Sequence, residues 1–206
     1  MTSLKIVSGL QKEINEDSVS NLKNKIRDLK LKFLMDECSF KMNLKLIKKK
    51  SFFFNTNYWS IIRKHKSLIL TGSTSLICAG FLNRPPGDID FLVPEDINFS
   101  DYCVKNKIQL KTDDSYSLST TEPIKNPDFL GFYYHKNYKV DFFKSKNPEF
   151  INVNRYKIHN PFEIIEKKMV HLKPIEKTNI SVIFDNMNLK IKTYRDISNI
   201  IENYES

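Results

Sequence analysis

"LTGSTSLICAGFLNRPPGDIDFLV", residues 70–93, is the stretch that decides the fold of this chain. An apolar run ending in "LTG" predicts a short buried strand, and "STSLICAGFL" predicts a helix that begins at the serine. The "RPPG" that follows predicts a rigid loop, because each proline fixes its own φ and restricts the residue before it. "DIDFLV" then predicts a second strand that ends at Pro94. Strand, helix, loop and strand therefore follow one another within one short stretch.

The Gly-Ser pair at positions 72 and 73 lies at the junction of the first strand and the helix. Gly72 has no side chain, so an anion can approach its backbone closely. Ser73 can cap the helix and offer its hydroxyl, and the free N–H groups of a helix start bind phosphate. Most Gly-Ser pairs are ordinary turns or caps, so this pair gains weight only in combination with other residues.

Two aspartates one residue apart interrupt the second apolar strand. Asp88 and Asp90 occupy positions i and i+2, which places both carboxylates on the same face of the strand. Two adjacent carboxylates repel each other unless a cation lies between them, and Mg²⁺ prefers such oxygen ligands. The alternative is that they are two acids near a strand end, paired with Arg84 or a lysine.

A third aspartate interrupts another apolar strand, "YKVDFF". Asp141 is either an edge residue in a salt bridge or, if its strand lies beside the first Asp pair, the third member of a carboxylate cluster. Three such carboxylates can hold two metal ions, one activating a nucleophilic oxygen and the other neutralising a triphosphate. The cluster would explain why acids occupy apolar strands.

The remaining pattern indicates strands among helices, and hence an α/β or α+β domain. "FLGFYYH" and "YKVDFF" predict a hairpin with "KN" as its turn. Apolar spacing or a helix-start proline predicts helices at about 18–36, 97–107, from Pro161 onward, and 192–203. We divide the chain into an N-terminal helical segment packed on or appended to the core (1–60), a core (61–150) and a C-terminal helical part that completes the cleft (151–206).

Composition sets broad limits. A hydrophobic fraction of 40% in 206 residues is enough for a packed core. No apolar run is long enough to span a membrane and the start lacks the layout of a signal peptide, so we expect a cytoplasmic protein with no membrane partner. The net charge of +9 fits a polyanion-binding surface and a merely solvated lysine-rich surface equally well. The 3 cysteines are widely spaced and suggest neither a disulfide framework nor a zinc site.

Taken together, the motif residues resemble the nucleotidyltransferase-fold superfamily, the polymerase β-like proteins. The resemblance rests on Gly72-Ser73, the Asp88-Ile89-Asp90 triplet that begins 15 positions later, and the separate strand residue Asp141. With Arg84 shortly before the Asp pair, the chain looks most like the AbiEii/MenT group, nucleotidyltransferase toxins of toxin–antitoxin and phage-defence systems. Two looser matches are the helix "PFEIIEKK", with Lys168 or alternatively Lys167, and "KTYRDI", with Lys192, Arg195 and Asp196.

The resemblance implies a small mixed β-sheet flanked by helices, with N- and C-terminal helical additions. It also implies transfer of a nucleoside monophosphate from an NTP, such as ATP, to a hydroxyl, with release of pyrophosphate and a requirement for two Mg²⁺ ions, or Mn²⁺. The implied catalytic and metal-binding residues are Asp88, Asp90 and Asp141, and the implied nucleotide-binding residues are Gly72, Ser73, Arg84 and Lys168.

The acceptor stays open among RNA, with the tRNA 3′ end favoured, a protein hydroxyl and a small molecule. The resemblance further implies the cytoplasm of a bacterium or a phage-infected cell, and an antitoxin or other protein as a possible partner. The alternative from another class is a catalytically silent module of the same fold that binds a nucleotide, RNA or a protein.

Overall fold

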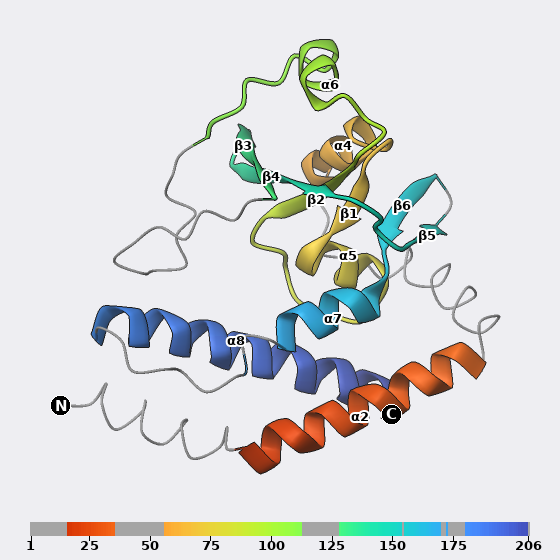
Figure 1. Ribbon diagram of the computed structural model, residues 1–206, viewed down its shortest axis with the longest axis vertical. Helices are drawn as coiled ribbons and strands as arrows, with labels where there is room; N and C mark the ends of the chain where they lie inside the picture. The colour runs from red at the N-terminus through yellow and green to blue at the C-terminus, as the bar shows by residue number, and fades with distance from the viewer. Residues whose placement is uncertain are drawn as a thin grey trace.

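The structure is a computed structural model that describes residues 16–35, 56–112, 128–153, 155–169, 172 and 180–205. Its centre is a six-stranded mixed sheet in the order β3-β4-β2-β1-β6-β5 (Figure 1). The strands are β1 (Ile69–Thr71), β2 (Ile89–Pro94), β3 (Phe129–His135), β4 (Tyr138–Ser145), β5 (Phe150–Val153) and β6 (Tyr156–His159). The described helices are α2 (Glu16–Met35), α4 (Thr56–Lys64), α5 (Gly72–Cys78), α6 (Phe99–Lys105), α7 (Pro161–Met169) and α8 (Ile180–Glu205). The expected mixed α/β class is confirmed.

Strands β1, β2 and β4 form the middle of the sheet. β2 is antiparallel to β1 and parallel to β4, and the register pairs Asp90 with Thr71 on one side and with Asp141 on the other. The strand carrying Asp141 therefore lies directly beside the strand carrying Asp90, as the sequence analysis required for a carboxylate cluster. β6 is parallel to β1 on its other edge, with Leu70 opposite Ile158.

The face of the sheet opposite the aspartates is apolar. Phe91 and Phe142 follow Asp90 and Asp141 in their strands, so their side chains point to the other face, where their rings stack 6.1 Å apart. His65 is buried against this pair and binds the hydroxyls of Tyr102 and Tyr133 at 2.7 and 2.6 Å. This packing buries one face of β2 and β4 in the core, and so fixes the strands that carry Asp90 and Asp141.

Strands β3 and β4 form the expected hairpin. His135 and Tyr138 are its last paired residues, and the turn between them is Lys136-Asn137. Lys136 takes a left-handed φ of 56°, the conformation that tight hairpin turns require. The prediction of a hairpin from "FLGFYYH" and "YKVDFF" is confirmed.

The terminal helices α2 and α8 lie side by side below the sheet in Figure 1. The predicted helical face of α2 is buried at Leu22, Ile26 and Leu29. Lys30 of α2 also forms a 2.8 Å ion pair with Glu166 of α7. α8 is much longer than the predicted 192–203, because it already begins at Ile180. No helix in the described part of the chain is long and apolar enough to cross a membrane.

The part predicted as helical, 151–206, begins instead with two strands. β5 and β6 form a hairpin in which β6 pairs with β1, so the sheet continues past residue 150. Each strand has only 4 residues, and β6 pairs with a strand almost ninety positions earlier. Periodicity within a short window carries no information about such a partner.

Candidate functional site

Three carboxylates converge at the middle of the sheet. Asp90 lies on β2, Asp141 lies beside it on β4, and Asp88 lies in the loop directly before β2. One oxygen from each of the three lies within 4.8 Å of the other two. The predicted convergence is confirmed, and a set of three oxygens at this spacing suits a hard divalent cation.

The cluster carries an electrostatic strain. Asp141 is fully buried, whereas Asp88 and Asp90 are half-buried. Burial raises the pKa of Asp90 well above its ordinary value, and the charges of Asp88 and Asp141 raise it further. Lys139 offsets part of this repulsion, because its Nζ lies 3.1 Å from Oδ1 of Asp141. A bound cation would offset the rest.

Gly72 is required where it stands for two reasons. Its φ of +63° is in the left-handed region, which side chains other than glycine adopt at a cost. A Cβ added to it would also overlap Oδ2 of Asp90. The carboxylate of Asp90 therefore packs directly against this glycine, and phosphate binding by the Gly72 backbone stays a prediction.

The expectation that the helix begins at Ser73 and that Ser73 caps it is wrong. α5 begins at Gly72 with Thr71 as its N-cap residue, and Thr71 makes no side-chain capping bond. Ser73 belongs to the first turn, where it is buried but still lines the cleft described below. The glycine can begin the helix because it accepts the left-handed φ that the sharp strand-to-helix turn demands.

Two side chains hold the loop that carries Asp88. The hydroxyls of Thr74 and Tyr58 both donate to the backbone carbonyl of Asp88, at 2.9 and 3.1 Å. These bonds come from α5 and α4, so two helices fix the position of the first aspartate. The Asp88 carboxylate remains free to face the cleft.

Arg84 is engaged by α8. Its Nε and Nη2 donate to the two carboxylate oxygens of Asp196, each at 2.8 Å. Lys168 of α7 approaches the same carboxylate at 3.7 Å. Three residues singled out by the resemblance therefore meet, but only Lys168 lines the cleft. Nucleotide binding by Arg84 stays a prediction. In the structure, its ion pair with Asp196 connects the proline-rich loop to α8.

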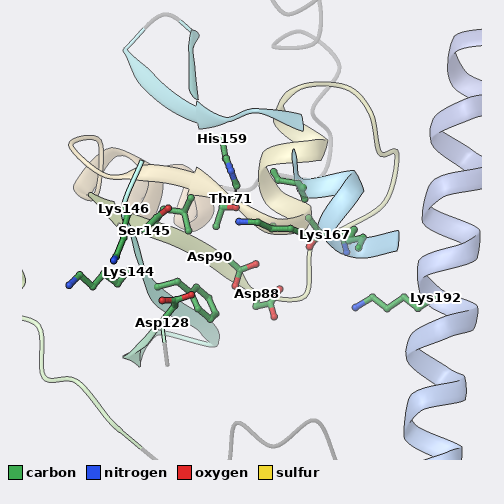
Figure 2. Close-up of a pocket in the computed structure, with 16 residues that line it drawn as sticks. Thr71, Asp88, Asp90, Asp128, Lys144, Ser145, Lys146, His159, Lys167 and Lys192 are labelled. Atoms are coloured by element: carbon green, nitrogen blue, oxygen red, sulfur yellow. Dashed lines mark hydrogen bonds between the residues drawn. The ribbon is translucent and has the colours of Figure 1, made fainter. Parts of the chain in front are cut away.

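A cleft of about 700 Å³ opens in front of the aspartates, a size typical of sites for small molecules. Figure 2 shows Asp88 and Asp90 at its centre, Lys144, Ser145 and Lys146 on one side and Lys192 reaching in from α8 on the other. The lysines that line it are Lys144, Lys146, Lys167, Lys168 and Lys192. Carboxylates at the floor and ammonium groups at the rim suit a metal-bound polyphosphate.

Sequence reasoning missed several lining residues. Lys144 lies near the end of the strand that carries Asp141 and Lys146 directly follows that strand, and this alternation in "FFKSK" was a usable signal. Thr71 and His159 also line the cleft, from the ends of two neighbouring strands. His159 gave no signal, because its partner Thr71 is 88 positions away in the sequence and β6 was not predicted.

Comparison of the chain with protein-family models, with curated proteins and with solved structures found no match. The resemblance to nucleotidyltransferases thus rests on the motif residues alone.

Proposed function

We propose that this chain is a metal-dependent nucleotidyltransferase that moves a nucleoside monophosphate from an NTP to a hydroxyl. The observation that carries the proposal is the cluster of Asp88, Asp90 and Asp141, with oxygens within 4.8 Å of one another, at the floor of a lysine-lined cleft. An acidic cluster alone would repel a triphosphate, and lysines alone would not bind a cation. The two together match a nucleotide that arrives with its metal.

In this proposal the three aspartates hold two Mg²⁺ or Mn²⁺ ions. When bound, these ions would act as Lewis acids that polarise the α-phosphate and lower the pKa of the acceptor hydroxyl. The chain's own residues hold the rest of the nucleotide. Lys168 and the other lysines of the cleft neutralise the triphosphate, and Gly72 and Ser73 lie where the β- and γ-phosphates would rest.

The acceptor oxygen bonds to the α-phosphorus, the bond from that phosphorus to the bridging oxygen breaks, and pyrophosphate leaves. RNA is the favoured acceptor, because the cleft opens between lysines from β4, α7 and α8 that can also contact a phosphate backbone. An antitoxin or other protein partner, and a cytoplasmic location, stay predictions.

The test is incubation of the chain with each α-³²P-labelled NTP, Mg²⁺ and total RNA, followed by separation of RNA, protein and small molecules. Asp90→Asn and Asp141→Asn remove one carboxylate charge each with little change in shape. Asp96→Asn is the matched control, because Asp96 is exposed and does not line the cleft. We expect label in RNA with the wild type and the control, and none with the other two variants. Label in protein or in small molecules would identify one of these as the acceptor in place of RNA. Label in no fraction would refute transfer and favour a binding module.

A further inference from the structure

A row of polar side chains crosses four strands of the sheet. Asp141, Asp90 and Thr71 are successive register partners on β4, β2 and β1, and His159 ends β6 beside Thr71. Figure 2 shows the His159 side chain pointing toward Thr71, with the aspartates on the other side of Thr71. The Thr71 hydroxyl therefore lies between a histidine and the carboxylate cluster.

Three residues form a hydrogen-bonded chain at the end of this row. Thr71 Oγ1 lies 2.7 Å from His159 Nδ1, and His159 Nε2 lies 2.5 Å from Oε2 of Glu163. A carboxylate only accepts hydrogen bonds, so Nε2 carries the hydrogen and donates it. Nδ1 of the neutral ring then has a free lone pair, and Thr71 donates its hydroxyl hydrogen to it.

Burial and further contacts hold His159 in this position. His159 is 1% exposed, its backbone carbonyl accepts a bond from the Ser75 hydroxyl at 3.3 Å, and Glu163 follows four residues later in the first turn of α7. Burial lowers the pKa of His159, while the neighbouring Glu163 acts in the opposite direction. A lowered pKa favours the neutral ring, which is the form that accepts a proton.

A hydroxyl, a base within hydrogen-bond reach and an acid that orients the base are the three parts of an activated nucleophile. We propose that Thr71 itself accepts a nucleoside monophosphate from an NTP bound at the aspartates, so that the chain labels itself. Thr71 Oγ1 bonds to the α-phosphorus, pyrophosphate leaves with the bridging oxygen, and the hydroxyl proton passes to Nδ1 of His159. This inference rests on the proposed function for the bound nucleotide, and goes beyond it by naming a second acceptor.

A purely structural role is the competing explanation. The same three residues tie β1 to β6 and α7, and such a tie would stabilise the fold without any chemistry. The two explanations predict different results in one measurement, because only self-labelling adds the mass of a nucleoside monophosphate to Thr71. Loss of activity in a variant would not separate them.

The experiment uses the full chain with Mg²⁺ and either α-³²P- or γ-³²P-labelled NTP, with and without total RNA. Intact mass spectrometry counts the groups added, and tandem mass spectrometry of peptides locates them. We expect one nucleotidyl group on Thr71, labelled from the α- but not the γ-phosphate. Thr71→Val, which keeps the branched shape, should abolish it, and Thr71→Ser should retain it. His159→Asn should slow labelling by about 100-fold or more, the range for loss of a general base.

Several outcomes would overturn the inference. Label on another residue, label that persists in Thr71→Val, or label from the γ-phosphate only would each do so. RNA labelled by a chain whose Thr71 stays unmodified would overturn this inference and leave the proposed function standing. If RNA, the chain and the small molecules all stay unlabelled, both this inference and the proposed function fall. Because the site is mapped in the wild type, the decision holds even if a variant fails to fold.

Discussion

Replacing Asp90 by Asn should stabilise the metal-free protein while removing its response to Mg²⁺. Asp90 shares the middle of the sheet with two other carboxylates whose nearest oxygens lie within 4.8 Å. Burial and these charges raise its pKa, which means that the ionised form is strained in the fold. Asn has nearly the same shape and no charge, so the strain disappears. The substitution removes a ligand for the same reason.

The magnitude follows from the spacing. At 4.8 Å two unit charges repel by about 3.5 kcal/mol at an effective dielectric constant of 20 and by about 0.9 kcal/mol in water. Asp88 is half-buried and Lys139 offsets part of the charge of Asp141, so the net gain should be about 2 kcal/mol. For a chain of this size that raises Tm by about 4–8 °C. Wild type in Mg²⁺ at ten times its dissociation constant should gain about 1.4 kcal/mol, or roughly 3–6 °C.

Thermal unfolding in EDTA and in a Mg²⁺ titration measures both effects, with Asp96→Asn as the matched control for loss of one surface charge. We expect Asp90→Asn to melt above the wild type in EDTA and to show no further rise with Mg²⁺. A variant that melts lower than the wild type in EDTA would refute the account of strain. A variant that still gains several degrees from Mg²⁺ would refute the role of Asp90 as a ligand.

Three further predictions concern the surroundings of the site. Gly72→Ala should lower the free energy of unfolding by about 1–3 kcal/mol, because it places a Cβ on a residue with a left-handed φ and against the carboxylate of Asp90. Urea unfolding measures this, with Gly87→Ala as the control, since nothing lies within 4 Å of its added Cβ. Equal losses of stability in the two variants would contradict the reasoning. Arg84→Met should lower the free energy of unfolding by about 3–5 kcal/mol, since it leaves the buried Asp196 without its bidentate partner. The double variant Arg84→Met, Asp196→Asn should recover part of that loss. If the effects of the two substitutions simply add in urea unfolding, the pair is not coupled. Burial lowers the pKa of His65 to about 3, so between about pH 3 and 6.5 the unfolded chain binds a proton at this residue and the folded chain does not. The free energy of unfolding should therefore fall by about 1.4 kcal/mol per pH unit as the pH drops from about 6.5 toward 3. Chemical unfolding at several pH values should show a smaller slope in His65→Gln, and an unchanged slope would assign the pH dependence to other groups.

The site was more predictable than the fold around it. Local spacing is enough to predict that Asp88 and Asp90 lie on one side, because side chains alternate along a strand, although Asp88 lies in the loop directly before β2 and not within it. Asp141 required one further assumption, the pairing of two strands about fifty positions apart, and β2–β4 pairing supplied it. The strand-to-helix turn at Gly72 also followed from a local rule, since glycine accepts conformations that other residues avoid.

Most of the missed features depend on distant contacts. β5 and β6 are too short to show a clear period, and β6 is stabilised by β1. The histidine at the end of β6 becomes chemically interesting only through Thr71, 88 positions earlier in the chain. The bond between Arg84 and Asp196 joins residues 112 positions apart. No window of a few residues contains such information.

The tie between Arg84 and Asp196 has a consequence for protein synthesis. Asp196 and Lys192 both belong to α8, the last described helix, so the cleft lacks one wall until that helix has been translated. A ribosome makes the aspartate cluster before it makes the wall of the cleft that α8 contributes. The nascent chain therefore carries its three carboxylates for more than fifty residues of synthesis before α8 can close the cleft. The order of translation therefore delays completion of the cleft until α8 has been made.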